Sequence, residues 1–266
     1  MVKRYKAFIW SNIPIALDAA AWTGLTYKAL YMEIDWMMVF IAFGFTWLFY
    51  TKDRTDASPA DSINNPERTA WYSTQTMIKP LMWIVTAELL ICLSQRLSIL
   101  IPVLIGIVPC LLYTKQLTVK GYTFTLKALP GIKVLLVAFL WVILSVIFPV
   151  VTLKTEIPQG ILAPLSLMIG CFVMLQINTN DLRDIEGDAL EGIKSFAVLL
   201  GDKMARLLGV LMIVLGVYFG WHLFERIPLL VFSVFLLVRT FLYKKEEDIY
   251  WQLPISLQGV LAYWIL

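Results

Sequence analysis

Two acid-rich segments carry the residue types best suited to chemistry. One of them reads NTNDLRDIEGDALEG and places Asp181, Asp184 and Asp188 at positions i, i+3 and i+7. On a helix with about 100° per residue, this spacing puts the three carboxylates within about a 60° arc. Three like charges on one face repel one another, and a shared divalent cation would remove that cost. The alternative is a solvated acidic face.

The other acid-rich segment is less regular. It reads YTKDRTDASPADSINNPERTAW and contains Asp53, Asp56 and Asp61, with Arg68 at its far side. Asp53 and Asp56 share a face if the preceding helix continues through them, but Pro59 is expected to end that helix. We therefore expect Asp61 on a loop or on a new segment.

Together the two segments indicate a site for a metal ion and a diphosphate. Hard oxygen ligands suit Mg²⁺, which usually takes one or two carboxylates together with substrate phosphates. An anionic diphosphate approaches six carboxylates only if cations bridge them, and nearby bases can neutralise the remaining oxygens. Loops on the cytoplasmic side of a membrane collect bases in any case, so each lysine is equally consistent with a topological role. The candidate bases are Arg68, Lys115, Lys120 and Lys194.

Other metal or redox chemistry is not indicated. His222 is the only histidine, and Cys92, Cys110 and Cys171 each lie in an apolar run without CxxC spacing. Neither a zinc site nor a disulfide framework follows from this pattern. The chemistry must come from carboxylates and bases.

The composition requires that these residues be positioned by membrane helices. Of the 266 residues, 59% are hydrophobic and 15% are charged, and the mean hydropathy is +0.76. A soluble domain has roughly 25% charged residues, and a formal charge of +3 gives no reason to expect a nucleic-acid partner. The sequence therefore predicts an all-α, multi-pass transmembrane bundle of about nine helices, with residues 1–266 forming a single integral membrane domain.

Nine apolar windows have the length that a helix needs to cross the hydrocarbon. No window alternates with the period of a barrel strand. The expected spans are 7–29, 34–51, 77–95, 97–114, 133–152, 160–179, 204–223, 227–243 and 249–266.

The distribution of bases predicts the orientation of these spans. With the N-terminus in the cytoplasm, most of the 22 Lys and Arg residues fall on the cytoplasmic side. Three connections on that side are long, at 52–76, 115–132 and 180–203, and they hold both acid-rich segments. Long connections in a compact bundle tend to be functional. The predicted active-site loops are therefore cytoplasmic.

The acid-rich segment at 178–192, which comes second along the chain, resembles a motif of the UbiA superfamily of intramembrane prenyltransferases, of the 4-hydroxybenzoate polyprenyltransferase type. The matching residues are Asp184, Asp188 and Gly192 in DxxxDxxxG, followed by GIKSFAVLLG. The family's first motif is usually an Asn-led pair of aspartates four apart, followed by an Arg-Pro element. Here Asp53-Arg54 resembles its start, position 57 is alanine, and NNPER, at 64–68, closes the segment.

The resemblance implies a fold of nine membrane helices and a reaction. The reaction is Mg²⁺-assisted ionisation of an allylic prenyl diphosphate, followed by capture of the carbocation by a lipophilic, aromatic acceptor within the membrane. The implied partners are these two substrates and membrane lipids, without a nucleic acid, and no protein partner is inferred. The implied catalytic residues are Asp53, Asp184 and Asp188. The implied metal ligands are Asp53, Asp56, Asp61, Asp181, Asp184 and Asp188. The implied diphosphate-binding residues are Asn64, Arg68, Tyr113, Lys115, Lys120 and Lys194.

Two other functions remain open at this point. A terpene cyclase would keep the fold and the ionisation step but would trap the cation with the chain's own double bond. A transporter would require functional charges near the membrane midplane, where only Asp18 and Glu88 are found. Each of these two acids could line an acceptor pocket or pack helices together.

Overall fold

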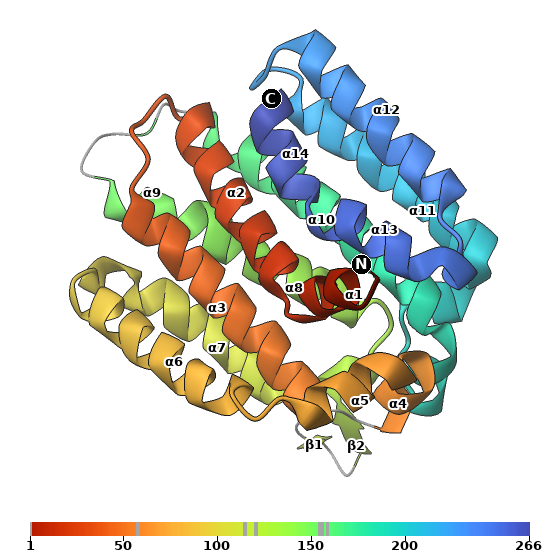
Figure 1. The fold of residues 1–266 in the computed structure, drawn as a ribbon. Helices are drawn as coiled ribbons and strands as arrows, with labels where there is room; N and C mark the ends of the chain where they lie inside the picture. The colour runs from red at the N-terminus through yellow and green to blue at the C-terminus, as the bar shows by residue number, and fades with distance from the viewer. Residues whose placement is uncertain (1, 57–58, 114–115, 120–121, 154–156, 158–159) are drawn as a thin grey trace.

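The computed structural model describes residues 2–56, 59–113, 116–119, 122–153, 157 and 160–266. Within these residues the chain is almost entirely helical, as predicted, and the helices run side by side across the molecule (Figure 1). The helices before the hairpin are α1 (Val2–Trp10), α2 (Ile13–Ala29), α3 (Trp36–Thr55), α4 (Pro59–Asn64), α5 (Pro66–Thr74), α6 (Ile78–Ser94), η1 (Leu97–Ile99) and α7 (Leu100–Tyr113). Those after it are η2 (Leu126–Ala128), α8 (Ile132–Val142), η3 (Ile143–Ile147), α9 (Phe148–Thr152), α10 (Leu162–Leu190), α11 (Phe196–Gly220), α12 (Arg226–Leu242), η4 (Lys245–Glu247), α13 (Asp248–Ser256) and α14 (Gln258–Ile265).

Each of the nine predicted spans coincides with a helix or with helices in succession. Two continuous helical stretches, 132–152 and 162–190, are each long and apolar enough to cross a membrane by themselves. The pair α5 and α6, bent by 80°, passes the same test only if it counts as one span. The crossing of all nine therefore stays a prediction.

Three predicted boundaries were wrong. The loop expected from residue 180 is helical, because α10 continues through its acidic segment to Leu190. The first predicted span is broken at Asn12, which has a φ of 59°, and the last is broken at Leu257. Apolar periodicity does not register such breaks, because the residues on both sides of each one are apolar.

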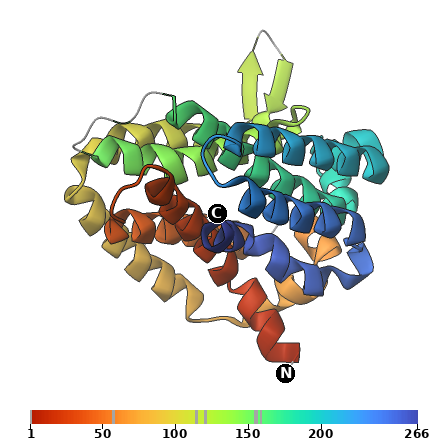
Figure 2. The ribbon, with the colours of Figure 1, turned by 90° about the horizontal axis from the view of Figure 1, so that it is seen from above.

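A small hairpin is the departure from a purely helical chain within the described residues. Strands β1 (Gln116–Val119) and β2 (Tyr122–Thr125) pair antiparallel in the connection that was predicted only as a loop. Figure 2 shows the hairpin projecting from the bundle.

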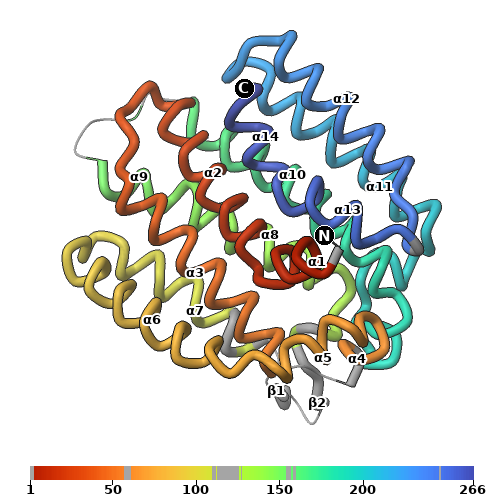
Figure 3. Tube along the Cα trace, viewed as in Figure 1, coloured from red at the N-terminus to blue at the C-terminus, as the bar shows by residue number. Residues whose placement is uncertain are grey.

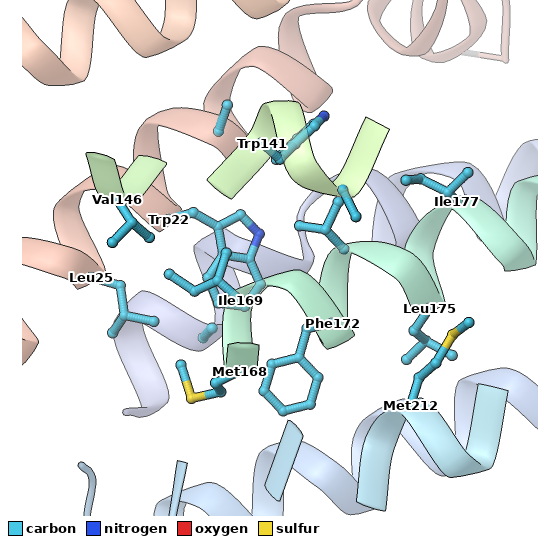
Figure 4. Packing of buried hydrophobic residues seen from close by; sticks show 14 of the residues in the cluster. Trp22, Leu25, Trp141, Val146, Met168, Ile169, Phe172, Leu175, Ile177 and Met212 are labelled. Carbon is cyan, nitrogen blue, oxygen red and sulfur yellow. The ribbon is translucent and has the colours of Figure 1, made fainter. Parts of the chain in front are cut away.

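The core forms around α10, whose first half is apolar. The Trp22 ring from α2 stacks on Phe172 of α10 at a centroid distance of 6.2 Å, and Phe232 of α12 meets Phe172 edge-on at 5.3 Å. Figure 4 shows Trp22, Phe172 and Met168 in this cluster. Gly216 of α11 lies against the Phe172 ring, where an added Cβ would be 2.6 Å from it. The packing fixes α10 between α2, α11 and α12, and so fixes the acidic segment at its C-terminal end.

Of the two acids expected inside the membrane, Asp18 packs helices together. It is fully buried, and its carboxylate accepts hydrogen bonds from the Gly259 N–H of α14 and, at 3.0 Å, from the Gln176 amide of α10. The bond from Gly259 satisfies a backbone N–H just after the break between α13 and α14, and the Gln176 amide also donates to the Ile255 carbonyl just before it, at 2.8 Å. Figure 3 shows α14 running beside α2. Glu88 lies on the exposed face of α6.

Candidate functional site

The C-terminal part of α10 holds the second set of carboxylates. Asp181, Asp184 and Asp188 lie on this one helix, with exposed side-chain fractions of 1%, 14% and 7%. Gly192, with a φ of 68°, follows the helix end, where a left-handed residue commonly terminates a helix. These acids are therefore enclosed, and the alternative of a solvated acidic face is wrong.

Two bases neutralise these carboxylates. The ammonium of Lys133, from the first turn of α8, lies 2.7 Å from Asp181 Oδ1 and 2.8 Å from Asp188 Oδ2. The guanidinium of Arg183 holds both oxygens of Asp184, at 2.6 and 2.7 Å. From the sequence, both bases were expected only among the charges on the cytoplasmic side. The adjacency of Arg183 and Asp184 was a usable signal, whereas nothing local ties Lys133 to α10.

The first set of carboxylates is arranged differently. Asp61, on α4, lies 2.8 Å from an Arg54 guanidinium nitrogen and 3.1 Å from one of Arg68. Asp53 is 67% exposed and lies 3.4 Å from Arg54, and Asp56 is exposed and pairs with Lys52. The expected helix end before Pro59 and the placement of Asp61 on a new segment are both confirmed. Of the three acids, Asp61 is the enclosed one. The enclosed acids and bases of the two sets are called the ionic cluster below; they are Arg54, Asp61, Arg68, Lys133, Asp181, Arg183, Asp184 and Asp188.

Asn64 connects the two sets. Its Oδ1 accepts a hydrogen bond from the Gly187 N–H at 3.0 Å, and its amide nitrogen donates to the Asp184 carbonyl at 3.4 Å. The contact is possible because Gly187 lacks a side chain, and an added Cβ would collide with the Asn64 amide. Asn64 was predicted to bind diphosphate, and in the structure its amide docks α4 on the backbone of α10.

Arg68 is a buried base that lies beside both arginines and aspartates. Its side chain is 9% exposed and pairs with Asp61. Burial, together with the nearby Arg54 and Arg183, lowers its pKa to about 9, while Asp184 and Asp61 act in the opposite direction. A buried guanidinium beside a cavity is a favourable position for an anion, because planar guanidinium groups bind phosphate oxygens in pairs.

An open cavity of about 340 Å³ lies beside these arginines. Its lining includes Arg68, Arg183 and Asn64, together with Lys6 and Trp10 from α1. A smaller cavity of about 50 Å³ shares both arginines and Trp10. Among the described residues, the lining of the larger cavity presents bases from the ionic cluster and none of the three α10 aspartates.

The region after α12 completes the cluster. Asp248, at the start of α13, lies 3.5 Å from Arg183 and accepts a hydrogen bond from the Tyr243 hydroxyl at 2.9 Å. Asp248 was not predicted as a site residue, because a lone acid at the start of a span resembles an ordinary helix-terminal charge.

The oxygen donors at this site fit a Mg²⁺ ion that is held partly by protein carboxylates and partly by oxygens of a substrate. In the part of the chain that the structure describes, no group of three or more acidic, histidine or cysteine side chains could hold a metal ion by itself. Asp181 Oδ2 is nevertheless buried without a hydrogen-bond partner, which leaves a hard oxygen acceptor available. Mg²⁺ commonly takes one or two carboxylates and completes its shell with water and phosphate oxygens.

Of the remaining predicted diphosphate ligands, the structure describes the side chain of Lys194. Tyr113 is the last residue of α7, and Lys115 and Lys120 lie outside the described residues. The Lys194 side chain is exposed, and its backbone carbonyl accepts a hydrogen bond from the Gly131 N–H at 3.0 Å. Their roles stay predictions.

The fold is an apolar helical bundle of the kind found in membrane proteins, and it holds a buried ionic cluster beside a cavity lined by several bases. Comparison with known proteins gives the family. The chain belongs to the UbiA prenyltransferase family, whose model matches residues 59–249. The resemblance found in the sequence is therefore confirmed, and the protein is a membrane prenyltransferase.

Individual relatives are distant. The chain is 25% identical over 243 residues to digeranylgeranylglyceryl phosphate synthase of Methanobrevibacter smithii, covering 87% of this chain and 82% of the relative. A structure described for the biosynthesis of digeranylgeranylglyceryl phosphate synthase in membranes matches with a TM-score of 0.54 and 20% identity, covering 98% of this chain and 97% of that one. A UbiA homolog from Archaeoglobus fulgidus, bound to GPP and Mg²⁺, matches with a TM-score of 0.50 and 14% identity, covering 98% and 95%. These two structures show the fold.

Proposed function

We propose that this prenyltransferase uses Mg²⁺ to transfer a prenyl group from an isoprenyl diphosphate to a lipophilic acceptor within the membrane. The observation that carries the proposal is the pair of buried arginines, Arg68 and Arg183, which line a cavity and contact Asp61 and Asp184. This arrangement supplies an anion site next to carboxylates that suit Mg²⁺. Support also comes from the homolog whose structure is described as bound to GPP and Mg²⁺.

The residues have distinct tasks in this proposal. Arg68 and Arg183 bind oxygens of the diphosphate, and their acidic partners hold the guanidinium planes in place. When bound, Mg²⁺ supplies stabilisation of the charge that develops on the departing diphosphate. We assign the metal to Asp181, Asp184 and Asp188 on one side and to Asp53, Asp56 and Asp61 on the other, with Asp56, which is exposed and paired with Lys52, contributing least. Catalysis then depends on Asp53, Asp184 and Asp188.

Aromatic side chains stand where a carbocation would need them. Trp10 lines both cavities, and Tyr50 lines the smaller one. Aromatic faces attract cations without acting as nucleophiles. We propose that these rings shield the prenyl cation from water until the acceptor attacks it.

Two classes of acceptor suit the proposed transfer. A lipophilic aromatic compound is the class that the sequence resemblance implies. The name of the relative from Methanobrevibacter smithii adds a second class, a prenylated glyceryl phosphate, whose phosphate would suit the bases of the cavity. The comparisons give no support to the cyclase alternative, and membership of a prenyltransferase family argues against a transporter.

We further propose that residues 1–266 form one integral membrane domain with nine spans. The N-terminus and the loops that carry the acids lie in the cytoplasm in this arrangement. The positive-inside distribution of bases supports it. Cysteine labelling from each side of sealed vesicles tests it, and labelling of position 56 only from the non-cytoplasmic side would contradict it.

Diphosphate release by the purified protein tests the proposed function. Geranyl, farnesyl and geranylgeranyl diphosphates are supplied with and without Mg²⁺, alone or with a 4-hydroxybenzoate-type acceptor, geranylgeranylglyceryl phosphate or a membrane lipid extract. We expect Mg²⁺-dependent release that requires an acceptor, with the prenylated product identified by mass spectrometry. Acceptor-independent release of a cyclised product, or no release with any acceptor, would contradict the proposal.

A further inference from the structure

Lys133 occupies an unusual position for a cation. It lies in the first turn of α8, after Gly131, where the helix dipole disfavours positive charge. Its ammonium bridges Asp181 and Asp188, which lie two helical turns apart on α10. The two carboxylates therefore compensate the cost of placing a lysine at this helix end.

The ammonium also occupies the space that a metal ion would need. Asp181 and Asp188 both direct an oxygen at Lys133, while Asp181 Oδ2 is buried without a partner. A cation that binds both carboxylates would take the same position between them, and two cations at that point would repel each other. Lys133 and a metal ion therefore compete for these carboxylates.

The two bases that contact the α10 acids differ in how easily they can leave. Arg183 is held to Asp184 through two parallel hydrogen bonds, and Asp248 lies on its other side. Lys133 has a single ammonium on a flexible stem, and its side chain is 21% exposed. Lys133 is therefore the base that can move without breaking a bidentate pair.

We propose that Lys133 is an exchangeable counter-ion for the metal site. With the site empty, it neutralises Asp181 and Asp188. When Mg²⁺ arrives with a diphosphate, the ammonium leaves the carboxylates and donates to a diphosphate oxygen. This inference rests on the proposed function and adds to it a residue that couples metal and diphosphate binding.

The coupling has a thermodynamic signature. Mg²⁺ alone must displace Lys133 without giving it another partner, so it binds weakly. With diphosphate present, the displaced ammonium gains a new anion, so each ligand strengthens the binding of the other. Loss of Lys133 removes both its competition with Mg²⁺ for the carboxylates and its new contact with the diphosphate.

Binding measurements on the detergent-purified protein test this coupling. Mg²⁺ is titrated by calorimetry and Mn²⁺ by electron paramagnetic resonance, each with and without geranyl S-thiolodiphosphate as a non-reacting analogue. For Lys133→Met we expect Mg²⁺ alone to bind about tenfold more tightly and the analogue alone about tenfold more weakly than in the wild type. Lys203→Met, which removes an exposed lysine on α11, is the matched control and should change neither.

Thermal unfolding separates exchange from a purely structural role. Lys133→Met should lower the Tm without Mg²⁺, because two carboxylates are left unpaired, and Mg²⁺ should restore it. Lys133→Arg covers the case in which the methionine variant does not fold. Its guanidinium should hold the carboxylates more firmly and weaken the binding of Mg²⁺ alone.

The outcomes distinguish this inference from the proposed function. Equal loss of Tm with and without Mg²⁺ for Lys133→Met, or wild-type Mg²⁺ affinity in both Lys133 variants, would overturn the exchange and leave the enzyme's function standing. A wild-type protein that binds neither the metal nor the analogue would instead overturn the proposed function.

Discussion

The two acid-rich segments use the same residue type in opposite ways. On α10, three aspartates lie on one continuous helix, enclosed by protein and in contact with Lys133 and Arg183. In the first segment, at the end of α3 and on α4, Asp53 and Asp56 are exposed, and Asp61 is the enclosed acid, in contact with Arg54 and Arg68. The α10 segment is preorganised before any ligand arrives, whereas the first segment is held to it through Asn64.

This difference assigns different costs to the loss of each acid. Removal of one partner from an enclosed ion pair leaves an uncompensated charge, which is expensive. An exposed pair contributes about 0 to 1 kcal/mol. Mutations in the two segments should therefore separate by their effect on activity, and three experiments test that separation.

The largest effect is expected for Asp184→Asn. The amide cannot hold Arg183 through two charged hydrogen bonds and is a poorer metal ligand, so we expect diphosphate release to fall by about a thousandfold. Insertion and helical content should be retained. Asp202→Asn, which alters an exposed pair with Arg206, is the control. Full activity of purified Asp184→Asn would contradict the assignment of the metal site to α10.

The second experiment compares two acids within the first segment. Asp61→Asn removes the carboxylate shared by Arg54 and Arg68, and we expect about a hundredfold loss of diphosphate release. Asp56→Asn alters an exposed pair with Lys52, and we expect a loss of about threefold or less. Steady-state rates with geranyl diphosphate provide the measurement. Equal losses in the two variants would show that burial does not rank these acids.

The third experiment loosens the contact between the segments. In Gly187→Ala the new methyl group pushes the Asn64 amide away, and we expect a loss of about 1 to 3 kcal/mol in stability. The KM for the prenyl diphosphate should rise about tenfold while kcat changes less. Gly170→Ala on the same helix is the control, because its added Cβ would lie 3.5 Å from Val142, an ordinary contact. Identical behaviour of both variants would refute the role of this contact.

The helices within the nine predicted spans could be predicted from the sequence because each span is a long apolar run. The polar helices α4 and α5, in the connection predicted at 52–76, could not. The boundaries that were wrong share a physical reason. The polar end of α10 is helical because it packs against α4 and α8, and those contacts join distant parts of the chain. The break at Leu257 is stabilised by Asp18 and Gln176, which local patterns near residue 257 cannot reveal.

The site residues that lie close together in the sequence could be predicted. The spacing of the α10 acids and the position of Arg68 identified residues that meet in the structure. Lys133 and Asp248 were not predicted as site residues, because each reaches the cluster only through tertiary packing. Pro59 made Asp61 look the least certain of the six acids, yet it is the enclosed acid of its segment, because α4 turns it toward Arg54 and Arg68.

The hydrogen bond between Asp18 and Gly259 joins residues separated by 241 positions. The contact cannot form during biosynthesis until residue 259 has left the ribosome, long after Asp18 has been made. Until then the Asp18 carboxylate has no backbone partner at α14, and α10, which also binds Asp18, lacks one of its neighbours. Assembly of this enzyme therefore finishes late, and a variant that weakens the contact should appear first as rapid turnover of newly made chains.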